Sequence, residues 1–544
     1  MADADKIDAL LKEASDAMRN GKAKVALRAA KQVLEVQPRS APALFISGMA
    51  EQARGRTDIA LNFLQMAAKA DPSVPEIQFN LGVFLGLAGR TLESEDVFEG
   101  LLKRLPDDVN VLANLGRAQY ANRKWLAAAE TLKKALKHAP GHVGILEQIG
   151  ASLQQAGDAD GAEKAYRQAL VISAENPDVH FNLGTVLSRK NDLEGALSAY
   201  KEAVRLNPKH AAAQRNLGHL LSKAGRFEEA IEPHRQASRS FQNDPNITYD
   251  LGYALAVSGR TDEALKVLGR ALSTHPGSSD FMNMLALTHF RNRDPESALA
   301  FAEQALDARP GDNTALAYKA MALNELGRHD EARSIYDIDG LVLAEMAAAP
   351  EGFDSIEAFN TAFVSYIEPH PSLSYSPLNR SLKGGQSTRE LLDGDDPVAT
   401  AFRSIIETAT AHYRAAHPVD ADHPFLARRP EKTEIACWAN IIDRGGFQDV
   451  HFHPPSWLSG VYYPKLPRIM EDPAREPAGW LEFGRAYYML DAQNEPPVRL
   501  IRPREGLIVL FPAYFGHRTI PFETDEKRIS VAFDIMPADR AIGF

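Results

Sequence analysis

Three histidines in the last hundred residues have the types and spacing of a mononuclear metal site. His451 and His453 lie one residue apart in the run DVHFHPPSWLSGVYY, residues 449–463, so their side chains project to the same side of an extended strand. His517 ends the later run LIVLFPAYFGH. Imidazole nitrogens from two strands can together hold one transition-metal ion. We therefore predict all three as ligands in a small β-barrel, with Asp449, on the same alternation as His451, as an orienting partner.

A buried cation is expected close to this site. The turn residues 524–527 predict a hairpin between HRTIPF and RISVAF. Strand alternation then sends Arg528, Ser530 and Ala532 to one face. An arginine inside a small barrel must meet an anion, because an unpaired buried charge is costly. That anion is either a ligand or a carboxylate of the chain, such as Glu482 or Asp534.

Short strands must position these groups. Segments rich in β-branched and aromatic residues are separated by glycine, proline or acidic turns: EIACWANII, WLSGVYYP, GWLEFGRAYY, GLIVLFPAYF, HRTIPF and RISVAFDIMP. Six or more such strands indicate a jelly roll or another antiparallel barrel.

A junction precedes the strands. LVLAEMAAAP, SIEAFNTAFVSYIEPH and DPVATAFRSIIETATAHYRAAH predict helices, and the third would suit the outside of a sheet. Residues 371–394, between the second and third, have neither a helical nor a strand period, which indicates a long functional or flexible loop.

The ordered motifs HFHPPSWLSGVYY, GWLEF, GLIVLFPAYFGH and RIS resemble the bacterial 2-oxoglutarate- and iron(II)-dependent oxygenases, which are similar to prolyl hydroxylases. NRSLKGGQSTRELLDG, residues 379–394, resembles the upstream segment of that family, so the resemblance covers roughly residues 355–540. It implies a double-stranded β-helix that binds Fe(2+) and uses 2-oxoglutarate and O2 as co-substrates. Catalysis is expected to need no protein group beyond the ligands of the metal and co-substrate.

The resemblance also implies roles for individual residues. Arg528 and Ser530 match the pair that holds the distal carboxylate of 2-oxoglutarate. Tyr463 matches a tyrosine that contacts the same carboxylate, with neighbouring Tyr462 as the alternative, and Asn440 is a further candidate for co-substrate binding.

The third metal ligand departs from the family. His451 and His517 match its two histidines, but His453 stands where the family has an aspartate or glutamate. One interpretation is a three-histidine site, which gives the metal a higher net positive charge. The other is a metal held by two histidines and either Glu482 or water, in which His453 contacts the ligands and does not bind the metal.

A repeat occupies the first three-fifths of the chain. Small residues recur every 34 positions, and a second small position follows each by 12. The first set is Ala14, Gly48, Gly82, Gly116, Gly150, Gly184, Gly218, Gly252, Ala286 and Ala320. The second set is alanine at 26, 60, 128, 162, 196, 230, 264, 298 and 332, with Ser94 as the exception. In-phase prolines stand at 38, 72, 106, 140, 208, 276 and 310. This pattern predicts closely packed antiparallel helix pairs that end at proline.

The period and spacing resemble the tetratricopeptide repeat (TPR), which stacks into a superhelix with a concave protein-binding groove. Two residues before the phased small position stands a polar row: Asn80, Asn114, Gln148, Asn182, Asn216 and Asp250. This row resembles the asparagine ladder with which O-GlcNAc transferase repeats hold an extended peptide, since an amide both donates and accepts. A local helix or turn role for these asparagines is the alternative.

Composition sets broader limits. The chain has 544 residues, a net charge of −11 and a single cysteine, Cys437. These values disfavour nucleic-acid binding and exclude an intramolecular disulfide. With no apolar signal core or membrane span in the sequence, we expect a cytoplasmic protein.

The predicted fold is an α + β multidomain protein. It comprises a superhelix of about ten TPR helix pairs over 6–338, a helical junction and loop of the C-terminal domain over 339–430, and a double-stranded β-helix (jelly roll) core over 431–544. The expected function is hydroxylation of a protein or peptide presented by the TPR groove, near the 371–394 loop and Trp457. A small-molecule substrate, a cupin-type metal barrel and a TPR scaffold without turnover are the alternatives.

Overall fold

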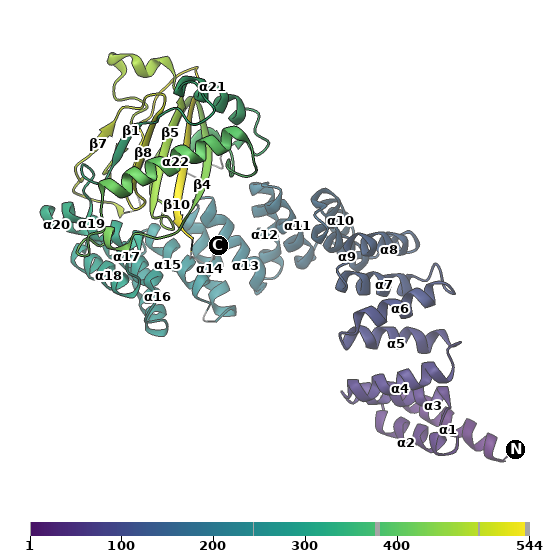
Figure 1. Ribbon diagram of the computed structural model, residues 1–544. Coiled ribbons are helices and arrows are strands. Elements are labelled where there is room, and N and C mark those ends of the chain that lie inside the picture. Colours follow the sequence, from purple (N-terminus) through teal and green to yellow (C-terminus); the bar gives the residue numbers. More distant parts are fainter. Residues whose placement is uncertain (1, 243, 376–380, 488–489, 539–544) are drawn as a thin grey trace. The chain divides into compact units, whose positions relative to one another are not determined.

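The computed structural model describes residues 2–242, 244–375, 381–487 and 490–538 (Figure 1). Its chain forms two compact units, residues 1–217 and 218–544, called here the N-terminal and C-terminal units. The division falls inside the repeat array, so the last repeats belong to the same unit as the β-sheet domain. Among the described residues, no helix is long and apolar enough to cross a membrane.

Antiparallel helix pairs make up the array, and the TPR superhelix predicted from the sequence is confirmed. The helices are α1 (Ala2–Arg19), α2 (Ala23–Val36), α3 (Ala41–Ala53), α4 (Thr57–Ala70), α5 (Pro75–Leu87), α6 (Thr91–Leu102), α7 (Val109–Ala121), α8 (Trp125–His138), α9 (Val143–Gln155), α10 (Ala159–Ile172), α11 (Pro177–Arg189), α12 (Leu193–Leu206), α13 (Ala211–Lys223), α14 (Phe227–Ser240), α15 (Pro245–Val257), α16 (Thr261–Thr274), α17 (Ser279–Arg291), α18 (Pro295–Ala308), α19 (Asn313–Glu325) and α20 (His329–Ile335). The in-phase prolines lie in the turns between successive pairs.

The phased glycines are needed because each faces a large side chain of the paired helix. A Cβ atom on Gly150 would lie 2.6 Å from the ring of Tyr166. The equivalent distance is 2.6 Å between Gly116 and Leu132. These separations are shorter than any van der Waals contact, so a side chain at either glycine would push the helices apart.

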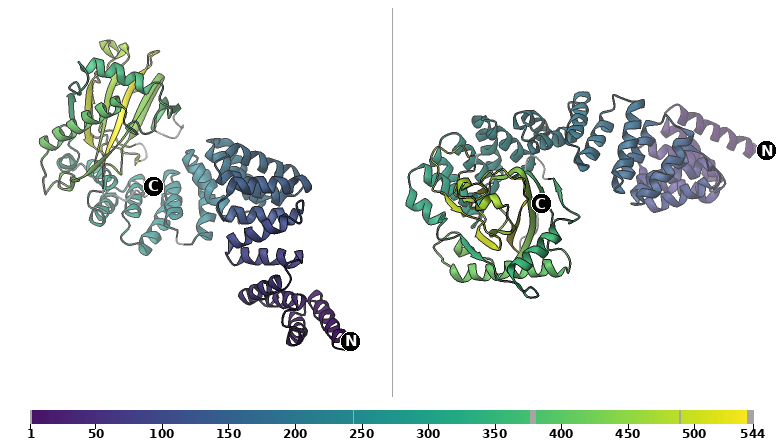
Figure 2. Two further views of the ribbon diagram at one scale, coloured as in Figure 1. Left: turned by 45° about the vertical axis from the view of Figure 1, so that its right-hand side comes forward. Right: turned by 90° about the horizontal axis from the view of Figure 1, so that it is seen from above.

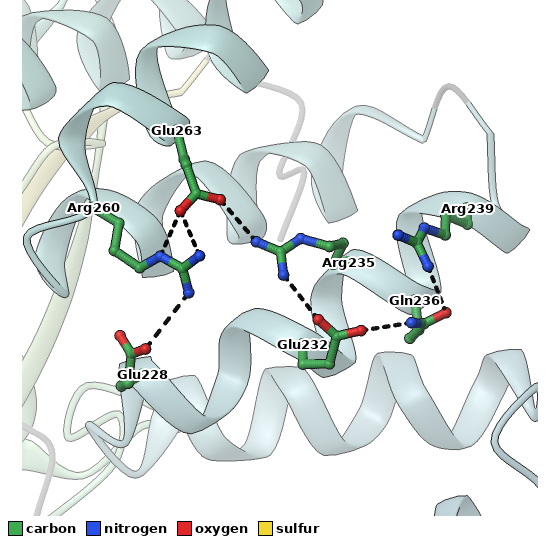
Figure 3. Close-up of polar contacts among 7 residues, drawn as sticks. All are labelled: Glu228, Glu232, Arg235, Gln236, Arg239, Arg260 and Glu263. Carbon is green, nitrogen blue, oxygen red and sulfur yellow. Dashed lines mark hydrogen bonds and ion pairs between the residues drawn. The ribbon is translucent and has the colours of Figure 1, made fainter.

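Ion pairs also join neighbouring repeats on the surface of the C-terminal unit. Figure 3 shows Arg235 of α14 between Glu232 and Glu263, with distances of 2.8 and 3.0 Å. Arg260 contacts Glu263 and lies 3.6 Å from Glu228. Exposed pairs of this kind contribute at most about 1 kcal/mol each. The stack of repeats therefore depends mainly on its buried apolar faces.

The C-terminal domain is a curled antiparallel sheet, confirming the jelly-roll fold class. Its strands are β1 (Leu343–Met346), β2 (Ser374–Tyr375), β3 (Leu382–Ser387), β4 (Thr433–His451), β5 (Leu458–Lys465), β6 (Leu481–Phe483), β7 (Arg499–Ile501), β8 (Leu507–Pro512), β9 (His517–Thr519) and β10 (Arg528–Pro537). They follow the order β1-β8-β5-β10-β4-β9-β6-β7, with β3 pairing β4 and β2 pairing β3. The right view of Figure 2 shows the strands of the sheet curled round into an arc.

The long strand β4 lies between two groups of strands, β1-β8-β5-β10 on one side and β9-β6-β7 on the other. Its first half pairs with β10, from Thr433 opposite Pro537 to Ile442 opposite Arg528. Its end pairs with β9, where His451 lies opposite His517. One strand therefore connects β10 with β9.

Two helices cover the outer face of the sheet (Figure 1): α21 (Ile356–Ile367) and α22 (Pro397–Ala416). Phe359 and Phe363 of α21 and Phe402 of α22 are fully buried against the ring of Tyr462 on β5. The apolar core of the domain thus lies between these helices and β5, leaving the inner face of the sheet for polar groups.

Three sequence-based expectations are wrong in this domain. LVLAEM is not helical: it contains β1, which pairs with β8 because this short apolar run completes the edge of the sheet. Residues 371–394 contain β2 and β3, although 376–380 lie outside the described residues. HRTIPF and RISVAF form no hairpin, since β9 and β10 pair with opposite ends of β4. The helix expected over DPVATAFRSIIETATAHYRAAH is α22, and that over SIEAFNTAFVSYIEPH is α21.

The last repeat packs directly on the sheet domain. Asn313, at the start of α19, donates from Nδ2 to the backbone oxygens of Pro454 (3.0 Å) and Ser456. The hydroxyl of Tyr336, which follows α20, accepts from the backbone N–H of Gly516 at 2.5 Å. These contacts reach the two turns that carry His453 and His517.

Candidate metal centre

A cavity of about 160 Å³ is lined by residues of β3, β4, β5, β6, β8, β9 and β10. Its lining includes the three predicted histidines and the four predicted co-substrate residues: His451, His453, His517, Arg528, Ser530, Tyr463 and Asn440. The fold thus brings residues from β4, β5, β9, β10 and the connection between β4 and β5 to one cavity.

The histidines form a compact group at one end of the cavity. One nitrogen from each can lie within 4.8 Å of the other two, a spacing that fits a single shared ion. The ring centres of His451 and His517 are 4.3 Å apart, because these residues are cross-strand partners. The ring of His453 lies 5.1 Å from His451 and 5.3 Å from His517.

Each imidazole is oriented through its Nδ1 atom. His451 Nδ1 lies 2.7 Å from the backbone oxygen of Asp449, and His517 Nδ1 lies 3.0 Å from that of Phe515. His453 Nδ1 instead donates to the Asp534 carboxylate at 2.9 Å. With Nδ1 occupied in all three rings, Nε2 is the atom left for a metal. Nε2 of His453 is buried and has no partner among the described residues.

Burial changes the ionisation of these rings. It lowers the pKa of His451 to about 3, with a smaller contribution from His453, and it holds the pKa of His517 well below the ordinary value. Burial also acts to lower the pKa of His453, but the Asp534 carboxylate outweighs it and raises that pKa. Two of the rings are therefore held in the neutral form that binds metals.

Two carboxylates considered from the sequence take other roles. Glu482 on β6 binds Arg485 and Arg518, the latter at 2.8 Å, so it faces neither the metal centre nor Arg528. Asp449 orients His451 through its backbone oxygen, while its side chain lies 3.9 Å from Lys383.

The other end of the cavity holds an unpaired buried cation. Arg528 is 1% exposed, and its Nη1 donates to the hydroxyl of Ser530 at 3.1 Å. In the described chain no carboxylate comes within ion-pair distance of its guanidinium, and its Nε has no hydrogen-bond partner. Among the described residues, the hydroxyl of Tyr463 and Nδ2 of Asn440 are likewise buried and have no hydrogen bond of good geometry. This cluster of polar groups is complete only with an anion.

The alternation on β5 separates the two tyrosines. Tyr463 lies over the Arg528 guanidinium, which is 5.2 Å from the centre of its ring. Burial raises the pKa of Tyr463, and the positive charge of Arg528 opposes that rise. Tyr462 points to the opposite side, where its hydroxyl bonds to the Oδ1 atom of Asn360 at 2.5 Å.

The expectation that Trp457 faces a substrate is wrong. Its side chain is 6% exposed and stacks on Phe425 at 6.1 Å, with the Arg414 guanidinium 4.6 Å from the ring. Trp457 thus fills the outer core between the sheet and α22. The half-buried tryptophan at the cavity is Trp438, which stacks on His453 with ring centres 5.9 Å apart.

The predicted amide row shows local contacts at several positions. Nδ2 of Asn80 and Asn114 donates to the backbone oxygen four residues earlier, at 2.8 Å in both cases. Nδ2 of Asn216 donates to the Tyr200 hydroxyl at 3.3 Å. The remaining members are Gln148, which lies beside Arg117, half-buried Asn182, and Asp250, whose pKa is raised by burial.

Some roles at the site were also missed. Asp534 was considered only as a partner of Arg528, although it is on the same alternation as Arg528, Ser530 and Ala532, and extending that pattern by one step could have placed it beside the metal centre. No local signal points to Asn313 or Tyr336, because their role depends on packing between the last repeat and the sheet.

Family models match both parts of the chain. The model of the family described as "Cilia and flagella-associated protein 70 C-terminal domain" matches residues 2–326, more than half of the sequence, and the chain belongs to this family of repeat proteins. The model described as "Putative 2OG-Fe(II) oxygenase" matches residues 436–534. The chain therefore joins a TPR-type array to a domain that matches the "Putative 2OG-Fe(II) oxygenase" family model.

Solved structures similar to this chain are repeat proteins. YrrB, described as "a TPR protein with an unusual peptide-binding site", is 23% identical, with a TM-score of 0.33 over 35% of this chain and 97% of its own. PilF of Pseudomonas aeruginosa is 18% identical, with a TM-score of 0.34 over 40% of this chain and 100% of its own. PilW, a type IV pilus biogenesis factor, is 19% identical, with a TM-score of 0.35 over 39% of this chain and 98% of its own. No curated protein matches the chain.

Proposed function

We propose that this protein is an Fe(2+)- and 2-oxoglutarate-dependent oxygenase that hydroxylates a residue of a protein or peptide bound by its repeats. One observation carries the proposal: a single cavity has three convergent imidazoles at one end and an unpaired guanidinium at the other. A metal-chelating keto acid with a second, distant carboxylate fits both ends at once.

The residues present fit a metal ion. His451, His453 and His517 would hold it through Nε2, because their Nδ1 atoms already have acceptors. Nε2 of His453 is buried and has no partner within the described parts of the chain, so it is a costly group that a metal would satisfy. When bound, iron with 2-oxoglutarate and O2 supplies the oxidation that turns a C–H bond into C–OH, with succinate and carbon dioxide as the other products.

The opposite end of the cavity fits the distal carboxylate of the co-substrate. Arg528 would donate to it and neutralise it, and the Ser530 hydroxyl, 3.1 Å from Nη1, would hold the guanidinium in place or share the anion. The Tyr463 hydroxyl and Nδ2 of Asn440 would donate from the side. The enclosing barrel wall excludes water from these contacts and so strengthens them.

The size of the cavity favours a large substrate that stays outside. A volume of about 160 Å³ leaves little room beyond a co-substrate, so the substrate would reach the metal by one inserted side chain. Trp438 is half-buried beside His453 and lines the cavity. Its ring is suited to contact the inserted group.

The TPR array supplies a surface for such a partner. We propose the polar row of Asn80, Asn114, Gln148, Asn182, Asn216 and Asp250 as its contact. Because Nδ2 of Asn80 and Asn114 is held by the helix, these amides would offer their oxygens as acceptors to peptide N–H groups. In the C-terminal unit, α17 and α19 are buried on nearly all sides, so the last repeats support the sheet domain instead.

We propose the domain limits 6–338, 339–430 and 431–544, with the middle segment part of the C-terminal domain. Its β1 pairs with β8, and the Tyr413 hydroxyl donates to the backbone oxygen of Leu341 at 3.0 Å. Both contacts lie within the sheet domain and its covering helices.

The test is conversion of 2-oxoglutarate to succinate by the full chain purified anaerobically and supplied with iron(II). Wild type should convert it slowly without substrate, while His517→Ala and Arg528→Ala should not. Binding of 2-oxoglutarate without any conversion, even with candidate peptides, would favour a non-catalytic TPR scaffold. The supporting observation is that, in the described residues, the cluster that could hold a metal contains three histidines and no carboxylate. Metal binding without 2-oxoglutarate binding would favour a cupin-type barrel.

A further inference from the structure

We infer that Asp534 supplies, through His453, the negative charge that a ligating carboxylate provides in related metal sites. This inference rests on the proposed function, because it concerns the same three-histidine centre. It makes Asp534 a positioning residue: its carboxylate contacts a ligand and does not reach the metal.

The contact geometry is that of a carboxylate–histidine–metal relay. Asp534 Oδ2 accepts from His453 Nδ1 at 2.9 Å, and Oδ1 accepts from the Ser459 hydroxyl at 2.6 Å. Both oxygens are therefore held, and the side chain is nearly buried, with 8% of the residue exposed. An ionised carboxylate accepts only, so in the neutral His453 ring the proton is on Nδ1 and the lone pair is on Nε2.

The other two ligands lack this feature. His451 and His517 are oriented by the neutral backbone oxygens of Asp449 and Phe515. Of the three histidines, His453 is the one that replaces an acid, and it is also the one whose Nδ1 atom bonds to a carboxylate. A carboxylate behind an imidazole makes it a more basic ligand and keeps a negative charge near the metal.

The position of Asp534 on β10 explains how the charge is placed. Arg528, Ser530, Ala532 and Asp534 alternate on the inner face of this strand, with Arg528 opposite Ile442 and Asp534 opposite Ala436 of β4. Arg528 does not neutralise Asp534, since within the described residues the partners of that carboxylate are His453 and Ser459. One strand would hold the co-substrate anion at one end and the metal's counter-charge at the other.

The experiment measures Co(2+) affinity of the full chain by competition with a chelator, together with the visible spectrum of bound Co(2+). Asp534→Asn keeps an acceptor for His453 and removes the charge. We expect it to weaken Co(2+) binding about 10- to 100-fold and to shift the spectrum. Asp534→Glu keeps the charge and should bind more tightly than Asp534→Asn.

A matched control is Glu345→Gln, which alters a carboxylate–imidazole contact of the same length, 2.9 Å to His412, away from the cavity. It should leave the affinity and spectrum unchanged. A double-mutant comparison separates charge relay from general stability: with His453→Ala already present, Asp534→Asn should cause little further loss.

The outcomes distinguish this inference from the proposed function. Wild-type affinity and an unchanged spectrum in Asp534→Asn would overturn the inference alone. An equal loss from Asp534→Asn in the His453→Ala background would also overturn it, because the carboxylate would then act independently of that ligand. Failure of wild type itself to bind Co(2+) would instead overturn the proposed metal centre.

Discussion

The hydrogen bond between Tyr336 and Gly516 predicts that the last repeat controls the metal centre. Tyr336 follows α20, and its hydroxyl accepts from the Gly516 N–H at 2.5 Å, one residue before His517. The ring is buried and packs on Phe515 at 4.3 Å between ring centres. Replacing Tyr336 with phenylalanine keeps the ring and removes only the hydroxyl.

The size of the effect follows from the group left behind. Removing the hydroxyl leaves a buried backbone N–H without its partner, which costs about 1 to 3 kcal/mol. If the turn relaxes to recover that cost, His517 moves with it, since its Nδ1 atom is bonded to the backbone oxygen of Phe515 in the same turn. Metal affinity should then fall by up to the same free energy, about 5- to 150-fold.

The assay compares Co(2+) affinity and thermal unfolding of Tyr336→Phe with those of Tyr413→Phe. Tyr413 is also buried and also bonds to a backbone group, donating to the Leu341 oxygen at 3.0 Å, but it lies outside the cavity lining. Both variants should lower the unfolding temperature, and only Tyr336→Phe should weaken the metal. Equal metal affinity in the two variants would refute the positional role of the last repeat.

Three further predictions concern the co-substrate and the repeats. Arg528→Gln should abolish measurable 2-oxoglutarate binding by calorimetry while Co(2+) affinity is kept, because it removes the cation at the far end of the cavity; retained binding would contradict the assigned anion site. Gly150→Ala should destabilise the array by about 1 to 3 kcal/mol in urea unfolding, since its Cβ would meet Tyr166 at 2.6 Å, whereas Gly100→Ala, with nothing within 4 Å, should not. Burial lowers the pKa of His234 to about 4, so the imidazole takes up a proton in the unfolded chain before it does so in the folded protein as the pH falls. The free energy of unfolding of wild type should therefore decrease by about 3 kcal/mol between pH 6.5 and 4. His234→Leu, matching Leu268 of the next repeat, should lose correspondingly less over the same range; equal losses would show that His234 is not responsible.

The repeats were predictable because their constraint is local and recurs. Each phased glycine faces one residue of its own helix pair, as Gly116 faces Leu132, so the same spacing is imposed on every unit. The exception Ser94 also has a local reason: its hydroxyl donates to the backbone oxygen of Gly82 at 2.7 Å. A pattern enforced within 34 residues can be read without knowing the rest of the fold.

The sheet domain was predictable only in part. Alternation correctly placed Arg528 and Ser530 on one face, because a strand determines that locally. Which strands pair is a non-local matter, and the expected hairpin between 517–522 and 528–533 was wrong for that reason. The contacts of Asn313 and Tyr336 with the metal-site turns are more distant still, spanning more than a hundred residues.

The hydrogen-bond partner of His453 also could not be predicted, because it depends on the pairing of distant strands. The sequence showed that an expected acid was missing, and Asp534 was considered only as a partner for Arg528. Eighty-one residues separate His453 from Asp534, and the pairing of β5 with β10 brings Ser459 opposite Asp534 to hold the carboxylate in place. Chemistry at the site can therefore be distributed between strands in a way that a linear motif does not show.

The central claim is tested most directly by 2-oxoglutarate turnover in the full chain. Wild type loaded anaerobically with iron(II) and then exposed to oxygen should form succinate in proportion to the 2-oxoglutarate consumed, and His517→Ala and Arg528→Ala should form none. Absence of both 2-oxoglutarate binding and succinate from a folded, metal-loaded wild-type protein would contradict the account.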